Sequence, residues 1–216
     1  MREKLTYLSA QDSQLGKLIN ILGELKIQKR GDCFVSLIRS IIGQQLSVTA
    51  SRKIYERLVT LTDGETTPEK ILSLPDEAIR GIGVSYRKID YMKDFSQKVL
   101  NNEIKLQEFD RLSNEEIIDL LTTVKGIGVW TVQMFLIFTL ERENVLAEQD
   151  VGLHRGAKWL YGGENGKEIL IEKAKNWSPY ETIASLYLWE VVNSGTIHQF
   201  KTFEEFYATH TSNIKG

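Results

Sequence analysis

The sequence predicts an all-α fold, and three observations support this class. Apolar residues recur at helical spacing along most of the chain, as at Phe34, Leu37, Ile38, Ile41 and Ile42. Side chains that make good N-caps precede several of these segments. The strict apolar–polar alternation of a half-buried strand is not convincing anywhere in the sequence.

Caps and prolines mark the expected helix starts. Thr67 and Ser178 each precede a proline, which suits the first turn of a helix. Ser113 and Ser178 also stand three residues before Glu116 and Glu181, the spacing of a capping box. We therefore expect helices near residues 12–27, 32–42, 47–61, 68–74, 86–101, 114–123, 129–141, 151–161, 166–176 and 179–193.

Composition and charge restrict the function classes. No stretch approaches the roughly 18 apolar residues of a membrane span, so no membrane partner is expected. The single cysteine, Cys33, excludes an internal disulfide framework and a cysteine-ligated iron–sulfur cluster. We expect an intracellular protein, cytoplasmic in a bacterium or nuclear in a eukaryote. The net charge of −2 argues against binding nucleic acid mainly through lysine and arginine.

Residues 117–140 predict two helices joined by the tight turn Lys125-Gly126-Ile127-Gly128. We expect Gly126 and Gly128 to allow positive φ or close backbone approach, and Ile127 to pin the turn into the core. The second helix then begins with amides that can bind a phosphate oxygen. An ordinary corner between two helices, turned by its glycines, is the alternative.

Several motifs in one order, from about residue 30 to residue 195, resemble the helix-hairpin-helix (HhH-GPD) base-excision DNA glycosylases. The helix-hairpin-helix would span about residues 114–141. Asp150 follows Gly128 by 22 residues, where the family carries its catalytic aspartate at the start of a new helix. Residues 177–189 resemble the closing helix of the 3-methyladenine DNA glycosylase II branch.

The resemblance implies two helical lobes around a DNA-binding cleft. It also implies a single unit over residues 1–216, without an additional N-terminal domain, that acts as a monomer on double-stranded DNA containing alkylated bases. The implied reaction is hydrolysis of the N-glycosidic bond of alkylated purines, of the 3-methyladenine and 7-methylguanine type, after base flipping. An abasic site would remain. The alternatives are a glycosylase of the same fold for oxidised or mismatched bases and a non-catalytic protein that binds damaged DNA.

The resemblance implies that Asp150 is the catalytic carboxylate. A structural alternative is the N-cap of a helix beginning at Val151, and the two roles are compatible. The N-terminal end of a helix stabilises negative charge. A fixed carboxylate can stabilise the positive charge that builds on the sugar, and it can orient or deprotonate the attacking water.

Trp130 stands where family members that also cut the backbone carry a Schiff-base lysine, so no lyase activity is expected. Trp130 can instead stack on a cationic extruded base, with core packing as the alternative. Tyr180 is a further candidate for the base pocket, whereas Trp177 and Trp189 are weaker candidates. Glu181 stands where the family often carries an arginine, which puts one phosphate or pocket contact in doubt.

Residues 41–47 resemble the family segment that fills the gap left by the flipped nucleotide. Gln45 is the expected intercalating residue, with Leu46 beside it. The alternative is that Gln44 and Gln45 form a polar helix terminus capped by Ser47. Arg39 and Lys88 are candidates for phosphate contacts.

The expected contacts to the DNA backbone come from the hairpin and the first turn after it. They involve Lys125, Gly126, Ile127, Gly128 and Thr131. The resemblance implies that hairpin carbonyls can hold a monovalent cation, but no cofactor is required. His154 lies four residues after Asp150, a spacing seen in metal sites, but no third ligand is apparent and no catalytic metal is expected.

Overall fold

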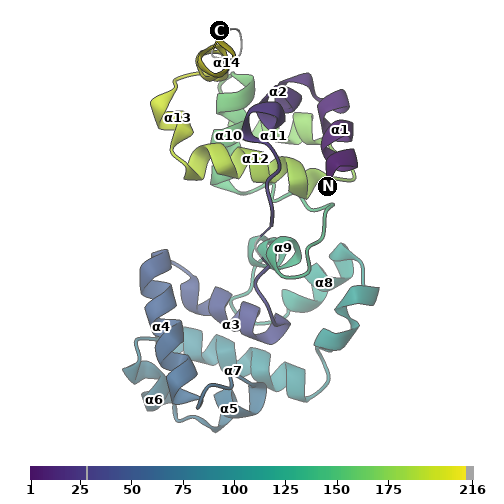
Figure 1. Cartoon of the computed structure of the whole chain (residues 1–216). Coiled ribbons are helices and arrows are strands. Elements are labelled where there is room, and N and C mark those ends of the chain that lie inside the picture. The colour runs from purple at the N-terminus through teal and green to yellow at the C-terminus, as the bar shows by residue number, and fades with distance from the viewer. Residues whose placement is uncertain (28, 213–216) are drawn as a thin grey trace. The chain divides into compact units, whose positions relative to one another are not determined.

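The computed structural model describes residues 1–27 and 29–212, which form helices joined by turns and short segments (Figure 1). None of these residues lies in a β-strand, so the predicted all-α class is confirmed. No helix within the described ranges is long and apolar enough to cross a membrane.

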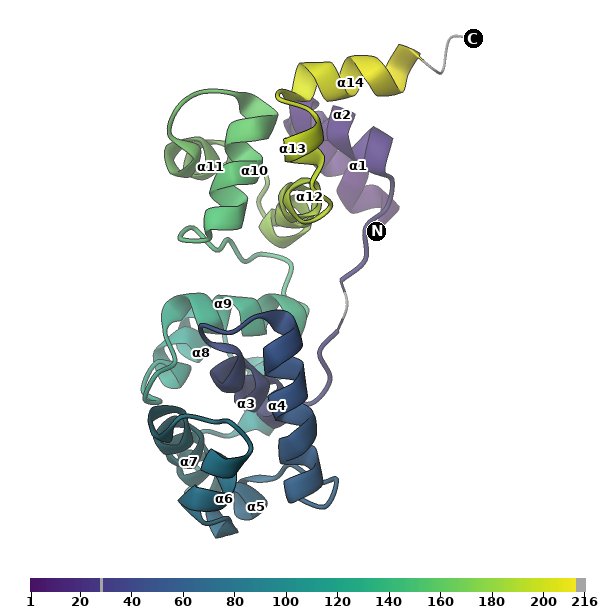
Figure 2. The same cartoon turned by 90° about the vertical axis from the view of Figure 1, so that its left-hand side faces the viewer.

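The chain divides into two compact units. Unit 1 joins the two ends of the chain, Met1–Gln28 and Glu141–Gly216, and unit 2 is the continuous segment Lys29–Leu140. These units confirm the two predicted helical lobes, and the cleft between them stays a prediction. In Figure 2, unit 1 carries the purple and the green-to-yellow helices, and unit 2 carries the blue and teal ones.

Unit 2 is built around the 15-residue helix α7, which packs against α3, α5 and α6. The rings of Phe34 and Phe95 stack in its core, with their centroids 5.1 Å apart. Helix α9 packs against both α3 and α8. The helices of unit 2 are α3 (Cys33–Gly43), α4 (Val48–Leu61), α5 (Pro68–Ser73), α6 (Asp76–Gly81), α7 (Tyr86–Leu100), η1 (Leu106–Arg111), α8 (Asn114–Leu121) and α9 (Val129–Phe138).

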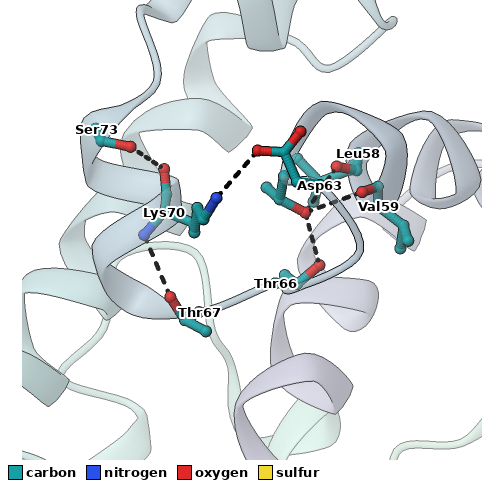
Figure 3. A network of polar contacts seen from close by, with 8 residues as sticks. Leu58, Val59, Asp63, Thr66, Thr67, Lys70 and Ser73 are labelled. Carbon is teal, nitrogen blue, oxygen red and sulfur yellow. Dashed lines mark hydrogen bonds and ion pairs between the residues drawn. The ribbon is translucent and has the colours of Figure 1, made fainter.

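The turn between α4 and α5 shows how local polar contacts end one helix and begin the next (Figure 3). Asp63 adopts the left-handed conformation, with φ 54°, and its carboxylate lies 3.1 Å from the ammonium of Lys70. The Thr67 hydroxyl accepts a hydrogen bond from the Lys70 amide, which confirms Thr67 as the N-cap before Pro68.

Unit 1 is held together by the close packing of α10 on α11 and α12. A Cβ at Gly156 would lie 2.7 Å from the Leu188 carbonyl oxygen, and a Cβ at Gly166 would overlap the His154 carbonyl. The helices of unit 1 are α1 (Arg2–Gln11), α2 (Ser13–Leu22), α10 (Val151–Tyr161), α11 (Gly166–Ala174), α12 (Glu181–Asn193), α13 (Thr196–Gln199) and α14 (Phe203–Ser212).

A buried carboxylate, Asp12, joins separate segments of unit 1. Asp12 caps α2 by accepting hydrogen bonds from the amides of Gln14 and Leu15. It also accepts the Tyr161 hydroxyl at 2.7 Å and the Trp177 indole N–H at 3.0 Å. Burial raises the pKa of Tyr161, and the nearby charge of Asp12 raises it further. Trp177 is fully buried in this cluster, so it is a core residue and does not line an open pocket.

The helices differ from the prediction in one boundary and in several additional short helices. The predicted helix 12–27 ends at Leu22, because Gly23 leaves the helical conformation at φ 70°. Shorter or weakly amphipathic helices were not predicted: α1, α6, α13 and α14. In α1 only Leu8 is buried, which explains the lack of an apolar pattern.

One predicted capping box is confirmed and the other is wrong. At Ser113 both bonds with Glu116 are present. Ser178 does not cap α12, because the residues before this helix form a turn in which the Trp177 carbonyl accepts the Tyr180 amide. The Ser178–Pro179 peptide is cis, Tyr180 is the N-cap, and α12 begins at Glu181.

Replacing Asp12 should destabilise unit 1. We expect Asp12→Ala to lower the free energy of unfolding by about 3 kcal/mol, because four donors lose their buried acceptor. Urea denaturation followed by tryptophan fluorescence measures this change. Lys158→Met, which removes an exposed ion pair with Glu164, is the control and should leave the midpoint unchanged. A loss below about 1 kcal/mol for Asp12→Ala would contradict the role of this carboxylate.

Candidate functional site

The hairpin between α8 and α9 has one position that only glycine suits and one glycine in an ordinary conformation. Gly126 has φ 75°, and a Cβ at this position would overlap the ring of Tyr91. Ile127 is 4% exposed, which confirms that it pins the turn into the core. The predicted positive φ is wrong for Gly128, which has φ −99° as the N-cap of α9, and a Cβ added there would meet open space.

The first turn of α9 combines helix-end amides with exposed apolar side chains. The first amides of an α-helix have no carbonyl partner within that helix. The first intrahelical bond of α9 joins the Val132 amide to the Gly128 carbonyl. Val129 and Trp130 are 50% and 47% exposed, so Trp130 is not an ordinary core residue, whereas Thr131 is buried. Any contact of Thr131 with a ligand would therefore use mainly its backbone.

Lys125, a predicted contact to the DNA backbone, already has partners within the protein. Its amide donates to the Asp94 carboxylate at 2.9 Å. Its ammonium lies 3.3 Å from the Asp90 carboxylate, and both side chains are 59% exposed. This pairing offsets part of the positive charge at the hairpin, so an anion there would depend more on the amides of α9.

The turn that joins α3 to α4, residues 44–47, carries the predicted intercalating residues. We call it the α3–α4 turn. Gln45 adopts the left-handed conformation at φ 58°, which is uncommon for a residue other than glycine. Gln45 and Leu46 are exposed. The Ser47 hydroxyl accepts the Ala50 amide and so caps α4, as the sequence suggested.

Two side chains tie the α3–α4 turn to neighbouring elements. The Gln44 side-chain amide donates to the Gly126 carbonyl at 2.8 Å, which joins this turn to the hairpin. The Lys88 ammonium donates to the carbonyls of Ile42 and Gln44 at 2.8 and 2.7 Å. Lys88 was predicted as a candidate for a phosphate contact, and the bonds that the structure gives it go to the protein backbone. The other such candidate, Arg39, lies 4.9 Å over the ring of Tyr55.

Asp150 lies in unit 1 at the start of α10, where it is the N-cap as the structural alternative predicted. Its Oδ1 atom accepts the Leu153 amide at 2.9 Å and the Trp189 indole N–H at 2.9 Å. Gly152 lies beside this pair, and a Cβ there would be 2.9 Å from Asp150 Oδ1 and 3.3 Å from the Trp189 ring. The sequence suggested Trp189 only as a weak candidate for lining a pocket, whereas the structure makes it a hydrogen-bond partner of the carboxylate.

Tyr180, the other pocket candidate in unit 1, belongs to a cluster around α1. Its ring meets the edge of Tyr7 at 5.4 Å between centroids. The Tyr7 hydroxyl donates to the Ser178 carbonyl at 2.7 Å. Lys4 lies 5.9 Å from the Tyr180 ring and forms an ion pair with Glu143. These contacts hold the segment before α12 against α1.

Glu181 does not form the predicted capping box. Its Oε2 atom is buried and has no hydrogen-bond partner in the described part of the chain. The sequence offered no sign of this, because the spacing to Ser178 suggested a local partner.

The structure also bears on the metal question. The His154 ring nitrogen Nε2 lies 2.7 Å from the Glu148 carbonyl, so this histidine is hydrogen-bonded to the backbone. Within residues 1–27 and 29–212 no group of three or more histidine, cysteine or acidic side chains is placed to hold a metal ion.

Most of the predicted site residues fall into two local groups, whereas Tyr180 belongs to the separate cluster around α1. In unit 2 the hairpin, Trp130 and the α3–α4 turn lie together, linked by the Gln44–Gly126 bond. In unit 1 Asp150 and Trp189 form a second group, to which Gly152 gives space.

Residues 38–179 match the HhH-GPD superfamily of base excision DNA repair proteins. The chain belongs to this family. DNA-3-methyladenine glycosylase 1 of Schizosaccharomyces pombe is 32% identical over 192 residues, covering 85% of this chain and 84% of that protein.

Two solved structures similar to this chain cover most of it. A DNA-3-methyladenine glycosidase from Bacillus halodurans is 41% identical, with a TM-score of 0.89 over 94% of each chain. A 3-methyladenine DNA glycosylase of Schizosaccharomyces pombe in complex with abasic DNA is 32% identical. Its TM-score is 0.79, over 88% of this chain and 97% of the other. The resemblance predicted from the sequence is therefore confirmed.

The two hairpin glycines should respond differently to substitution. We expect Gly126→Ala to lower the free energy of unfolding by about 2 kcal/mol, because the new Cβ overlaps Tyr91 and the backbone has positive φ. Gly128→Ala should cost less than about 1 kcal/mol, the difference between glycine and alanine at an N-cap. Thermal unfolding of both variants tests this, and equal losses would show that a side chain at position 126 causes no additional strain.

Proposed function

We propose that this HhH-GPD protein is a monofunctional DNA glycosylase that hydrolyses the N-glycosidic bond of alkylated purines in duplex DNA. Its substrates would be of the 3-methyladenine and 7-methylguanine type, and its product an abasic site. The observation that carries the proposal is the Asp150 carboxylate, held by the Leu153 amide and the Trp189 indole at the start of α10. The similarity to proteins named DNA-3-methyladenine glycosylase supports the substrate class.

Asp150 would act on the sugar and the water. Breaking an N-glycosidic bond builds positive charge on the sugar, and a fixed carboxylate stabilises that charge without first having to reorient. Two hydrogen bonds from different elements fix the Asp150 side chain before substrate arrives. The same carboxylate can orient or deprotonate the attacking water.

The leaving base needs less help than the sugar. An alkylated purine already carries positive charge, so it departs without a strong general acid. In the proposal the half-exposed ring of Trp130 stacks on the extruded cationic base. Tyr180 would contribute a second aromatic surface. A tryptophan at position 130 supplies no amine for a Schiff base, so the reaction would end at the abasic site.

Base flipping requires a group to fill the gap in the duplex, and Gln45 with Leu46 would supply it. Extruding a base costs a few kcal/mol, and an inserted side chain offsets part of that cost. Both residues are exposed at a turn whose backbone is held from two sides.

The protein would act as a monomer. It would bind the DNA backbone through the hairpin and the N-terminal amides of α9. A monovalent cation at the hairpin would assist phosphate binding. Backbone carbonyls are suitable hard oxygen ligands, and those of Val124 and Gly126 each accept a hydrogen bond while retaining a second lone pair. The ion would take no part in the chemistry, and no other cofactor is required.

Release of free bases from methylated duplex DNA tests the proposed function. We expect the wild type to release 3-methyladenine and Asp150→Asn to lose at least about 100-fold in rate, as for other losses of transition-state electrostatics. Binding of both proteins to an abasic duplex should be similar, since Asn preserves the shape of the side chain.

Other outcomes of this assay would each reject part of the proposal. Binding of damaged DNA without release would indicate a non-catalytic recognition protein. Release from oxidised or mismatched duplexes, but not from methylated ones, would indicate a different lesion class.

The position of the Asp150 side chain should matter independently of its charge. In Gly152→Ala the new Cβ would displace Asp150 Oδ1 or Trp189, so base release should fall by about 10- to 100-fold. Thermal stability should fall only slightly, because the preference of a helix for alanine over glycine offsets part of the cost of disturbing the Asp150 cap. Trp189→Phe, which removes the indole donor, should give a similar loss of release. Unchanged rates in both variants would show that this arrangement is unimportant.

A further inference from the structure

Lys88, at the start of α7, contacts the part of the α3–α4 turn that precedes Gln45. Helix α3 ends at Gly43, and the last carbonyls of a helix have no partner within it. The Lys88 ammonium donates to two carbonyls at this end, those of Ile42 and Gln44, at 2.8 and 2.7 Å. A positive charge at a helix C-terminus is also favourable for the helix dipole.

In making this contact, the Lys88 ammonium is partly removed from water. Lys88 is half-buried, and burial lowers the pKa of Lys88, with a further lowering by Arg87. Hydrogen bonds from a charged donor are stronger than those between neutral groups, so two of them hold the turn firmly.

The same turn is held on its other sides. The Gln44 side chain donates to the Gly126 carbonyl, and the Ser47 hydroxyl caps α4. Between these fixed points Gln45 adopts φ 58°, a conformation that persists in a residue other than glycine only where its surroundings enforce it. The Lys88 bonds end at Gln44, one residue before this position.

We propose that Lys88 is a positioning residue that holds the backbone of the α3–α4 turn so that Gln45 and Leu46 are presented for insertion into the duplex. This inference rests on the proposed function. Lys88 acts on the gap-filling residues and takes no part in the chemistry at Asp150. Its loss therefore impairs extrusion of a stacked base more than the bond cleavage that follows.

The test compares two lysines of α7. Lys88→Met removes the ammonium and keeps most of the side chain. Lys93→Met is the matched control, because Lys93 donates to the Leu74 carbonyl at the end of α5 at 3.0 Å and pairs with Asp76. Base release is measured on a duplex with one 7-methylguanine, either correctly paired or opposite a mispaired base.

We expect Lys88→Met to lower release from the correctly paired duplex by about 10-fold, and from the mispaired duplex by less than about 3-fold. A mispaired base is easier to extrude and depends less on the inserted residue. Lys93→Met should leave both rates unchanged, and Lys88→Arg should restore most of the release. Equal losses on the two duplexes would overturn the proposal, because they would indicate a general structural effect.

A double-mutant cycle separates positioning from stability. Gln45→Gly removes the inserted side chain and tolerates positive φ. If Lys88 acts through Gln45, adding Lys88→Met to Gln45→Gly should cause less than about a 2-fold further loss, so the two effects are not additive. Full additivity would contradict the inference.

A readout without catalysis keeps this inference separate from the proposed function. The fluorescence of 2-aminopurine placed next to the lesion rises when stacking is disrupted. We expect Lys88→Met to reduce that rise at saturating protein, even in the background of Asp150→Asn. If the wild type releases no base but this difference persists, the proposed function fails and the role of Lys88 stands. If Lys88→Met gives the same rise in fluorescence as the wild type, and the wild type releases base, only the role of Lys88 is rejected.

Discussion

Helix α10 approaches its neighbours to a distance that only glycine permits, and the arrangement around Asp150 depends on this approach. Gly156 lies against the Leu188 carbonyl of α12, and Gly166 of α11 lies against the backbone of α10. Leu188 directly precedes Trp189, so the close contact sets the distance between the indole and the start of α10. A larger residue at Gly156 would separate the two helices and lengthen the bond between Trp189 and Asp150.

The net charge is −2, so binding of DNA cannot depend mainly on an excess of lysine and arginine. The lysines next to the hairpin and the α3–α4 turn are themselves engaged within the protein. Lys125 is paired with Asp90, and Lys88 is directed to backbone carbonyls. The features available for an anion at the hairpin are therefore mainly dipolar: the amide end of α9 and the exposed turn before it. Binding through such dipoles depends on the position of the backbone, which agrees with the buried anchor Ile127 and the tightly packed Gly126.

Local patterns in the sequence predicted what depends on neighbours in the chain. The Ser113 capping box and the Asp150 N-cap involve residues within a few positions, and each is confirmed. Contacts between distant segments could not be predicted in this way. The bond between Trp189 and Asp150 and the burial of Trp177 against Asp12 depend on tertiary packing. The resemblance located the family motifs, whereas the partners of Lys88 and Glu181 required coordinates.

The division of the chain into a continuous and a discontinuous unit has a consequence for biosynthesis. Unit 2 is complete once residue 140 has been added, so the hairpin and the α3–α4 turn can acquire their contacts early. Asp12, between helices α1 and α2, is made early, but its hydrogen-bond donors Tyr161 and Trp177 are added only after the intervening segment has been translated. The carboxylate of Asp12 thus remains without its distant donors until late in synthesis, and Asp150 gains its indole partner only after Trp189 has been added.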